Sequence, residues 1–420
     1  MSVVLIAIGL LFFLNPCVWL WDVLPDFIGA FIIMLGMKKI IFLSDETEDV
    51  YKCLWVVVTI SAAKSVLSVF ISDNVGFRLL AAVVFAILEG IFLTIAVCRT
   101  VKCLNGIEYR FCDPNVPLPD SRFPALEKVL RVYTIFRIVV GFLPEFSLLS
   151  DIGKFGDVVS DGSYDPVDSK WSLYLMALLI TTVFLVVVLV MFFSAFSKYN
   201  KDKETPRAAV AAAEEVKAAD ISVWYGKKWR ILRIPFTVCA VLSIFFFVDN
   251  VDYLPKALAA TLLCILTFMS ASNIAQRVIA VVANAALAVS SVIVSLRLSD
   301  FFENYGDEFR SIWDTEARKD YFIITILFII QALLLFASFM LMTEVVKKTR
   351  LRQLSECGVP EKNVKRLKRQ ILRVRITSVA ALLAAAAYPI FRPDFPGVIA
   401  ILVLAGVVNA IFAFNVELEA

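Results

Sequence analysis

The sequence predicts an all-α protein: a polytopic helical membrane protein with about 12 transmembrane helices, built from parallel-oriented helical-hairpin repeats. Of its 420 residues, 60% are hydrophobic and 19% are charged, and the mean hydropathy is +0.82. Ordinary soluble domains are roughly 45–50% apolar, so they cannot cover this much apolar surface. The apolar runs 173–196 and 321–342 also exceed the roughly 20 residues that a helix needs to cross a bilayer.

The apolar segments predict the crossings in order. Asn15 and Pro16 interrupt the helical pattern of the first, because the residue before a proline disfavours the helix, and Lys38 and Lys39 interrupt the second. The N-terminal stretch has no basic region ahead of its apolar run, so we expect a retained span and not a signal peptide. The predicted spans are 3–20, 24–41, 53–71, 77–98, 126–143, 171–197, 229–248, 256–272, 276–297, 320–343, 371–390 and 396–414.

Lysine and arginine in the connections predict the orientation, because cytoplasmic connections are enriched in these residues. Segment 344–375 holds eleven basic residues and segment 198–230 holds eight, whereas segment 298–320 has seven acids and three bases. We therefore expect an inner-membrane protein with both termini in the cytoplasm. We expect an N-terminal bundle at 1–198, a cytoplasmic connector helix at 199–228 and a C-terminal bundle at 229–420. The C-terminal bundle includes a basic cytoplasmic loop at 344–370.

Two kinds of hairpin repeat along the chain. Type A runs helix, outer turn with proline and acid, helix, and type B runs helix, outer loop, helix. Each hairpin starts and ends on the same side, which indicates parallel repeats and not inverted ones. The order is A-B-B-A-B-A, with type A at 1–41, 229–272 and 371–414, and type B at 53–98, 126–197 and 276–343.

The type A turns carry the most distinctive motif, WDVLPDFIG at 21–29. A proline suits the first turn of a helix and an acid complements its positive end, so Pro25 and Asp26 mark a helix start. Gly29 permits close helix packing. Alternatively, these turns dip below the membrane surface and coordinate a cation or polar solute, although Lys256 replaces Asp26 in the second copy. The turn residues are Asn15, Pro16, Asp22, Pro25, Asp26 and Gly29, then Asp252 and Pro255, then Pro393 and Asp394.

The first turn also resembles a group of uncharacterised bacterial multi-pass membrane proteins with an N-terminal NP…DxLPDFxG motif. The matching residues lie between 10 and 40: Asn15, Pro16, Asp22, Leu24, Pro25, Asp26 and Gly29. The resemblance implies a bacterial inner-membrane protein and implies no activity.

Ionisable residues within predicted spans are functional candidates, because a charge at mid-bilayer costs several kcal/mol. Lys64 lies on a polar face with Ser61, Ser65 and Ser68, and Glu89 lies on the antiparallel partner helix. Counted from the turn between them, the two lie about 12 and 19 Å deep at about 1.5 Å per residue. We therefore predict a Lys64–Glu89 ion pair.

Three further polar positions extend this set. Arg137 either joins the Lys64–Glu89 pair or neutralises an acid elsewhere. The equivalent places in the later type B repeat hold Asn284, Ser291 and Gln331. The simpler interpretation is a buried polar network that fixes helix packing, and the alternative is a solute or proton pathway.

Composition narrows the function. The chain has no histidine, and none of its eight cysteines is spaced as CxxC. We therefore expect no metal, no cofactor and no catalytic residue. The predicted function is secondary transport or channel-like passage of a small solute or ion. The alternative is a membrane scaffold, and an intramembrane enzyme ranks third. Expected partners are anionic lipid headgroups at the basic cytoplasmic loops, and no nucleic acid.

Overall fold

The computed structural model describes most of the chain as two compact units, Met1–Asp220 and Ile221–Ala420. Helices make up most of the described part of each unit. The residues described are 1–15, 17–18, 21–22, 24–70, 75–111, 123–142, 166–201, 203–242, 247–248, 251–252, 256–271, 273–305, 318–356 and 361–391.

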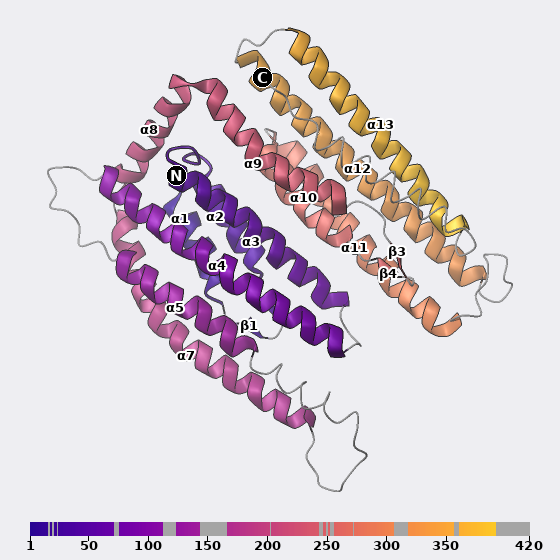
Figure 1. Cartoon of the computed structure of the whole chain (residues 1–420), viewed down its shortest axis with the longest axis horizontal. Coiled ribbons are helices and arrows are strands. Elements are labelled where there is room, and N and C mark those ends of the chain that lie inside the picture. The colour runs from indigo at the N-terminus through magenta and orange to yellow at the C-terminus, as the bar shows by residue number, and fades with distance from the viewer. Residues whose placement is uncertain are drawn as a thin grey trace, which may run out of the picture. The chain divides into compact units, whose positions relative to one another are not determined.

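The first unit is helical, with one short antiparallel ladder near its start (Figure 1). The ladder joins the two shortest helices, and the longer helices follow. In order the elements are α1 (Val3–Phe13), β1 (Cys17–Val18), β2 (Trp21–Asp22), α2 (Asp26–Met37), α3 (Asp45–Phe70), α4 (Val75–Phe111), α5 (Phe123–Phe142), α7 (Pro166–Lys201) and α8 (Glu204–Ala219).

Helices α1 and α2 form a close-packed hairpin. A Cβ atom built on Gly29 would lie 2.6 Å from Phe12 Cβ and 2.7 Å from the Gly9 carbonyl oxygen, so only glycine lets the two backbones approach this closely. A backbone hydrogen bond also joins the two helices at the end of the hairpin away from its turn, where the Ser2 N–H donates to the Gly36 carbonyl oxygen at 3.0 Å. The expectation that glycines on one side of α2 serve close packing therefore holds, and the neighbour is α1.

The longer helices surround this hairpin. Helix α3 lies against α2, and α4 and α7 both contact α1. At the tip, β1 lies against α5 and α7, and β2 lies against α3. Helix α3 itself begins with a capping box, in which the Ser44 hydroxyl accepts from the Thr47 N–H at 3.3 Å and the Thr47 hydroxyl accepts from the Ser44 N–H at 3.1 Å. The tip of the hairpin, which β1 and β2 form, therefore lies against α3, α5 and α7.

The second unit begins in the same way. Its elements are α9 (Ile221–Leu242), β3 (Phe247–Val248), β4 (Val251–Asp252), α10 (Lys256–Ser270), α11 (Ile274–Tyr305), α12 (Arg318–Glu356) and α13 (Glu361–Phe391). Cys17 pairs with Asp22 in the first ladder, and Phe247 pairs with Asp252 in the second. The two ladders therefore share one register at one constant sequence offset.

Four helices in the described part of the chain are long and apolar enough to cross a membrane, at Ala82–Phe111, Leu175–Ser197, Ile274–Leu298 and Arg318–Lys348. On α7, for example, Leu175, Leu179 and Val183 are 65%, 65% and 62% exposed. Such an apolar outer face suits lipid and not water.

Three predicted spans are shorter than expected. Helices α1, α2 and α10 have 11, 12 and 15 residues, which is about 17, 18 and 23 Å against a hydrocarbon core of about 30 Å. Span 3–20 is helical over Val3–Phe13 and then enters β1, because Asn15 bonds the carbonyl oxygens of the turn. The interruption that the sequence predicted at Asn15 is therefore present, and the helix of this span ends at Phe13.

The two connections that the sequence assigned to the cytoplasm also differ from expectation. The segment 344–370 is not a loop, because α12 continues to Glu356 and α13 already begins at Glu361. Its lysines, arginines and leucines favour helix, and the breakers Gly358 and Pro360 lie between the two helices in sequence. The connector helix expected at 199–228 is α8, which ends at Ala219, and α9 begins at Ile221.

Candidate functional site: a polar network at the hairpin tip

The centre of the site is the first residue of α2, Asp26, whose side chain is 1% exposed. Pro25 precedes it in extended conformation, as expected for a helix start. The next residue, Phe27, donates its N–H to the Ser61 hydroxyl of α3 at 3.0 Å. One of the N–H groups that a helix start leaves without an intrahelical partner is thus satisfied by a neighbouring helix. The sequence placed Asp26 in an outer turn, and the structure buries it.

Arg137 of α5 is the cationic partner of Asp26. Its Nη2 lies 3.0 Å from Asp26 Oδ2, and the arginine side chain is fully buried. Its Nη1 also donates to the Phe13 carbonyl oxygen at 2.6 Å. One turn earlier on α5, the Tyr133 hydroxyl donates to the Leu14 carbonyl oxygen at 2.7 Å. Two residues of α5 therefore bond the carbonyl oxygens at the C-terminal end of α1.

Asn15 closes the hairpin tip from within. Its Nδ2 donates to the carbonyl oxygens of Phe12 and Leu24, the latter at 2.6 Å, and lies 3.4 Å from Asp26 Oδ1. The side chain thus ties the end of α1 to the start of α2. Irregular backbone inside a membrane protein is tolerated where its polar groups are bonded in this way.

A second ion pair links α3 and α4. Lys64 Nζ lies 2.8 Å from Glu89 Oε2, and the two side chains are 2% and 7% exposed. This is the pair that the helical spacing predicted. Ser65, on the same face as Lys64, donates its hydroxyl to the Ser61 carbonyl oxygen at 2.9 Å. The side chain of Ser68 falls outside the described part of the structure.

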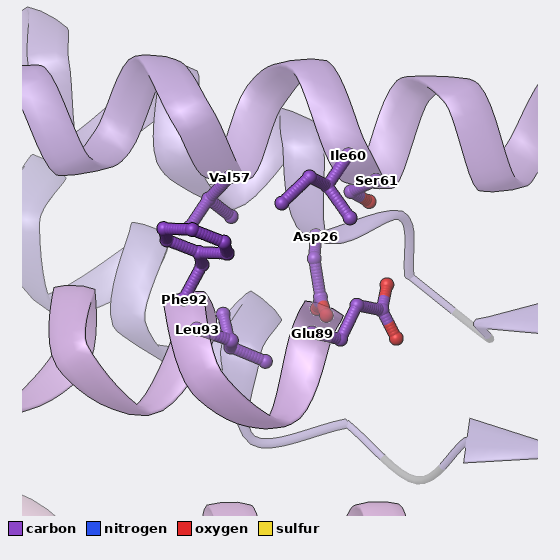
Figure 2. Close-up of a pocket in the computed structure, with 7 residues that line it drawn as sticks. All are labelled: Asp26, Val57, Ile60, Ser61, Glu89, Phe92 and Leu93. Carbon is purple, nitrogen blue, oxygen red and sulfur yellow. The ribbon is translucent and has the colours of Figure 1, made fainter. Parts of the chain in front are cut away.

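Asp26 and Glu89, the carboxylates of the two ion pairs, line one narrow crevice, shown in Figure 2. Asp26, Ser61 and Glu89 supply its polar side, and Val57, Ile60, Phe92 and Leu93 supply its apolar side. The space between its lining residues is about 170 Å³ when the part open to the outside is counted, and it has no room for a water molecule. The site therefore brings one carboxylate of each pair to one sealed space.

The chemistry available to this site follows from its groups. Two carboxylates, one guanidinium and one ammonium give no formal net charge when all are ionised. A buried ion pair is stable only while both partners stay in place, because either charge alone is strongly disfavoured in a low-dielectric interior. A proton or small cation that enters the crevice would therefore compete with Lys64 or Arg137 for a carboxylate.

Most of the other predicted residues belong to the second unit. In the second unit, Asn284, Ser291 and Gln331 are 2%, 2% and 3% exposed. The Asn284 amide bonds the Ala280 carbonyl of its own helix at 2.8 Å. Lys256 begins α10 as Asp26 begins α2, and it is also fully buried. Asp22 and Asp252 take part in the ladders through their backbones, while Pro16, Pro255, Pro393 and Asp394 fall outside the described residues.

Sequence reasoning allowed for Arg137 to neutralise an acid outside the Lys64–Glu89 pair but did not identify Asp26 as that acid. An isolated arginine in the apolar stretch TIFRIVV signals that an acid must lie nearby. No local spacing identifies that acid, because the partners are 111 residues apart. Within the described residues, no three Asp, Glu or Cys side chains are grouped as metal ligands.

Comparison with protein-family models, with curated protein sequences and with solved structures gave no match. The functional argument therefore rests on the geometry of this network.

Proposed function

We propose that the chain is a multi-pass protein of a bacterial inner membrane that passes a small solute or ion, as a secondary transporter or channel-like protein. One observation carries the proposal. The carboxylates of two buried ion pairs line a single crevice, beside the start of a helix that has only 12 residues. Short or interrupted helices with polar groups at their inner ends are typical of transporter sites.

The energetics of the pairs support a functional role. Replacing a buried ion pair with well-packed apolar residues is often neutral or stabilising, so stability alone is a weak reason for such pairs. Ionisable groups inside a membrane are also costly, because a charged side chain loses its hydration there. In this proposal, the narrow crevice belongs to the closed state of the protein. When the crevice opens, a carboxylate exchanges its contact with Lys64 or Arg137 for a contact with a mobile cation.

The proposal includes the finer architecture. We infer about twelve crossings in the order A-B-B-A-B-A, with both termini in the cytoplasm. The shared register of the two ladders supports a common origin for the first and fourth hairpins. Asp26 and Lys256 occupy the same place in those two hairpins but carry opposite charge, so the two tips would serve different roles.

A membrane scaffold is the second candidate, and the sealing of the site favours it. Lys64, Asp26 and Arg137 are each no more than 2% exposed, and the crevice has no room for water. In a scaffold, the two ion pairs would hold the α1–α2 hairpin against the longer helices, and the crevice would not open.

Thiol accessibility separates the two candidates. Single cysteines at Ser61 and Ser65, in a background without the native cysteines, are tested with a membrane-impermeant maleimide added from each side of the membrane. Lys52→Cys is the positive control, because Lys52 is 51% exposed near the polar start of α3, and Val56→Cys on the apolar outer face is the negative control.

A pathway predicts labelling at 61 and 65 from one side, with a rate that changes when Glu89→Gln removes the charge from one carboxylate. The scaffold predicts that neither cysteine reacts, with or without Glu89→Gln, while Lys52→Cys reacts fully. That second result would overturn the transport proposal.

A further inference from the structure

Helix α13 changes character along one face. Its inner stripe, Leu367, Ile371, Val374 and Ser378, is buried where the helix packs against α12 (Figure 1). The opposite face is exposed and begins with six bases, of which four follow one stripe at helical spacing and two, Lys365 and Lys368, lie beside that stripe. Further along the same face, the exposed residues are apolar. In order the stripe reads Lys362, Arg366, Arg369, Arg373, Ile376, Val379 and Leu383.

Along the stripe the change occurs within one helical turn, between Arg373 and Ile376, and Leu372 beside Arg373 is already 56% exposed. Ile376 and Leu383 are 59% and 65% exposed, which suits contact with lipid chains and not with water. Exposed bases directly beyond such a surface suit the layer of lipid headgroups. The boundary of the hydrocarbon core therefore falls between these two residues.

Contacts with α12 hold the helix at this level. Arg375 pairs with Glu344 of α12, and its Nε donates to the Thr343 hydroxyl at 3.3 Å. This arginine, at the boundary itself, thus has its counter-charge within the protein. The whole stretch 361–375 has seven basic residues and one acidic residue, so its outer face is strongly positive.

Depth divides the four bases of the exposed stripe. A headgroup layer is about 5–7 Å thick on each side of the core. With a rise of about 1.5 Å per residue, Arg369 lies about 6 Å above Arg373, and Arg366 and Lys362 lie about 10 and 16 Å above it. Arg373 and Arg369 fall within the headgroup layer, and the other two extend into water.

We propose that Arg369 and Arg373 form a binding surface for anionic phospholipid headgroups in the leaflet where α12 leaves the membrane. Guanidinium groups match phosphate oxygens in bidentate geometry. The exposed apolar residues below them accept the acyl chains of the same lipid. This surface is independent of the hairpin-tip network and of whether the chain transports anything.

The test uses the full chain in a neutral detergent with added phosphatidylglycerol or phosphatidylcholine. Lipid retention is measured by native mass spectrometry. Arg369→Gln with Arg373→Gln removes the two bases in the headgroup layer. Lys362→Gln with Arg366→Gln removes the same charge from the same face at greater height, and is the matched control.

The inner double variant should weaken phosphatidylglycerol binding by on the order of tenfold or more, at about one factor of five per base. The control should weaken it by less than about threefold, because charges beyond a Debye length of about 8 Å are screened. Arg369→Lys with Arg373→Lys keeps the charge and should retain the preference, which also shows that the face tolerates substitution.

Equal weakening by both double variants would overturn the proposal, because it would indicate a general positive field and not a headgroup site. Equal retention of the two lipids by the unaltered chain would also overturn it. A short single-stranded oligonucleotide serves as a further probe, and tighter binding of it than of phosphatidylglycerol would assign the basic face to another partner.

Discussion

Asp26 and Arg137 lie 111 residues apart in the sequence, yet Arg137 Nη2 is 3.0 Å from Asp26 Oδ2 and both side chains are sealed from solvent. This contact fixes the tip of the α1–α2 hairpin to α5. Together with the Phe27 N–H bond to Ser61, it places the start of a short helix against the middle of two longer ones. The hairpin is therefore held by specific polar bonds at its tip and by apolar contacts along its sides.

Close approach of α1 and α2 predicts strong sensitivity at Gly29. A methyl group there would lie within 2.7 Å of the Gly9 carbonyl oxygen. Because neither backbone can shift without separating the helices, we expect Gly29→Ala to lower the free energy of unfolding by about 1–3 kcal/mol. Thermal unfolding in detergent measures the effect.

Gly90→Ala is the matched control for this substitution. Gly90 also lies in a helix, but its added methyl group would lie 3.9 Å from the nearest atom of Ile138, at ordinary contact distance. Alanine favours the helix over glycine by up to about 1 kcal/mol, so this variant should be neutral or slightly stabilised. Equal losses in the two variants would show that α1 and α2 are not in close contact.

The Lys64–Glu89 pair predicts coupled losses. Each single alanine variant leaves an opposite charge buried and should lower the free energy of unfolding by about 3–5 kcal/mol. The double variant should lose about 2 kcal/mol less than the sum of the two, because it leaves no unpaired charge. Folded yield and thermal unfolding of the four proteins measure the coupling, and simple addition of the single losses would show that the pair is absent.

Asn15 is expected to be essential to the hairpin tip. Asn15→Ala removes the donor to the Leu24 carbonyl oxygen and should lower the free energy of unfolding by about 1–3 kcal/mol. Asn15→Asp should be more damaging, because it places a carboxylate near Asp26. Asn304→Ala, at an exposed amide that bonds its own helix, should change stability by less than about 0.5 kcal/mol. If the two alanine variants lost equally, Asn15 would have no special role at the tip.

Local pattern accounts for much of the fold and for one half of the site. The helical character and the Lys64–Glu89 contact follow from apolar periodicity and from residue spacing across one short connection. The helix start at Asp26 follows from Pro25 and the dipole of α2. These features depend on neighbours in the sequence, so the sequence was sufficient to predict them.

The remaining features depend on tertiary contacts. The break after α1 follows from Asn15 and Pro16 in the sequence, but the bond from Tyr133 to the end of α1 does not, because Tyr133 belongs to a helix that lies far along the chain. The predicted spans 3–20 and 24–41 are longer than helices α1 and α2, because hydropathy does not distinguish strand or turn residues from helical ones. The pairing of Arg137 with Asp26 likewise depends on how the α1–α2 hairpin packs against α5.

A double-mutant cycle on Asp26 and Arg137 tests the central claim, that the hairpin tip is buried against α5 by an ion pair. Asp26→Asn and Arg137→Gln should each lower the free energy of unfolding by about 3–5 kcal/mol. The double variant should lose about 2 kcal/mol less than their sum. The control is the exposed Glu127–Arg131 pair of the same helix, 2.8 Å apart, whose coupling should stay below about 1 kcal/mol. Strict additivity at Asp26 and Arg137, or coupling no larger than that of the exposed pair, would contradict the account.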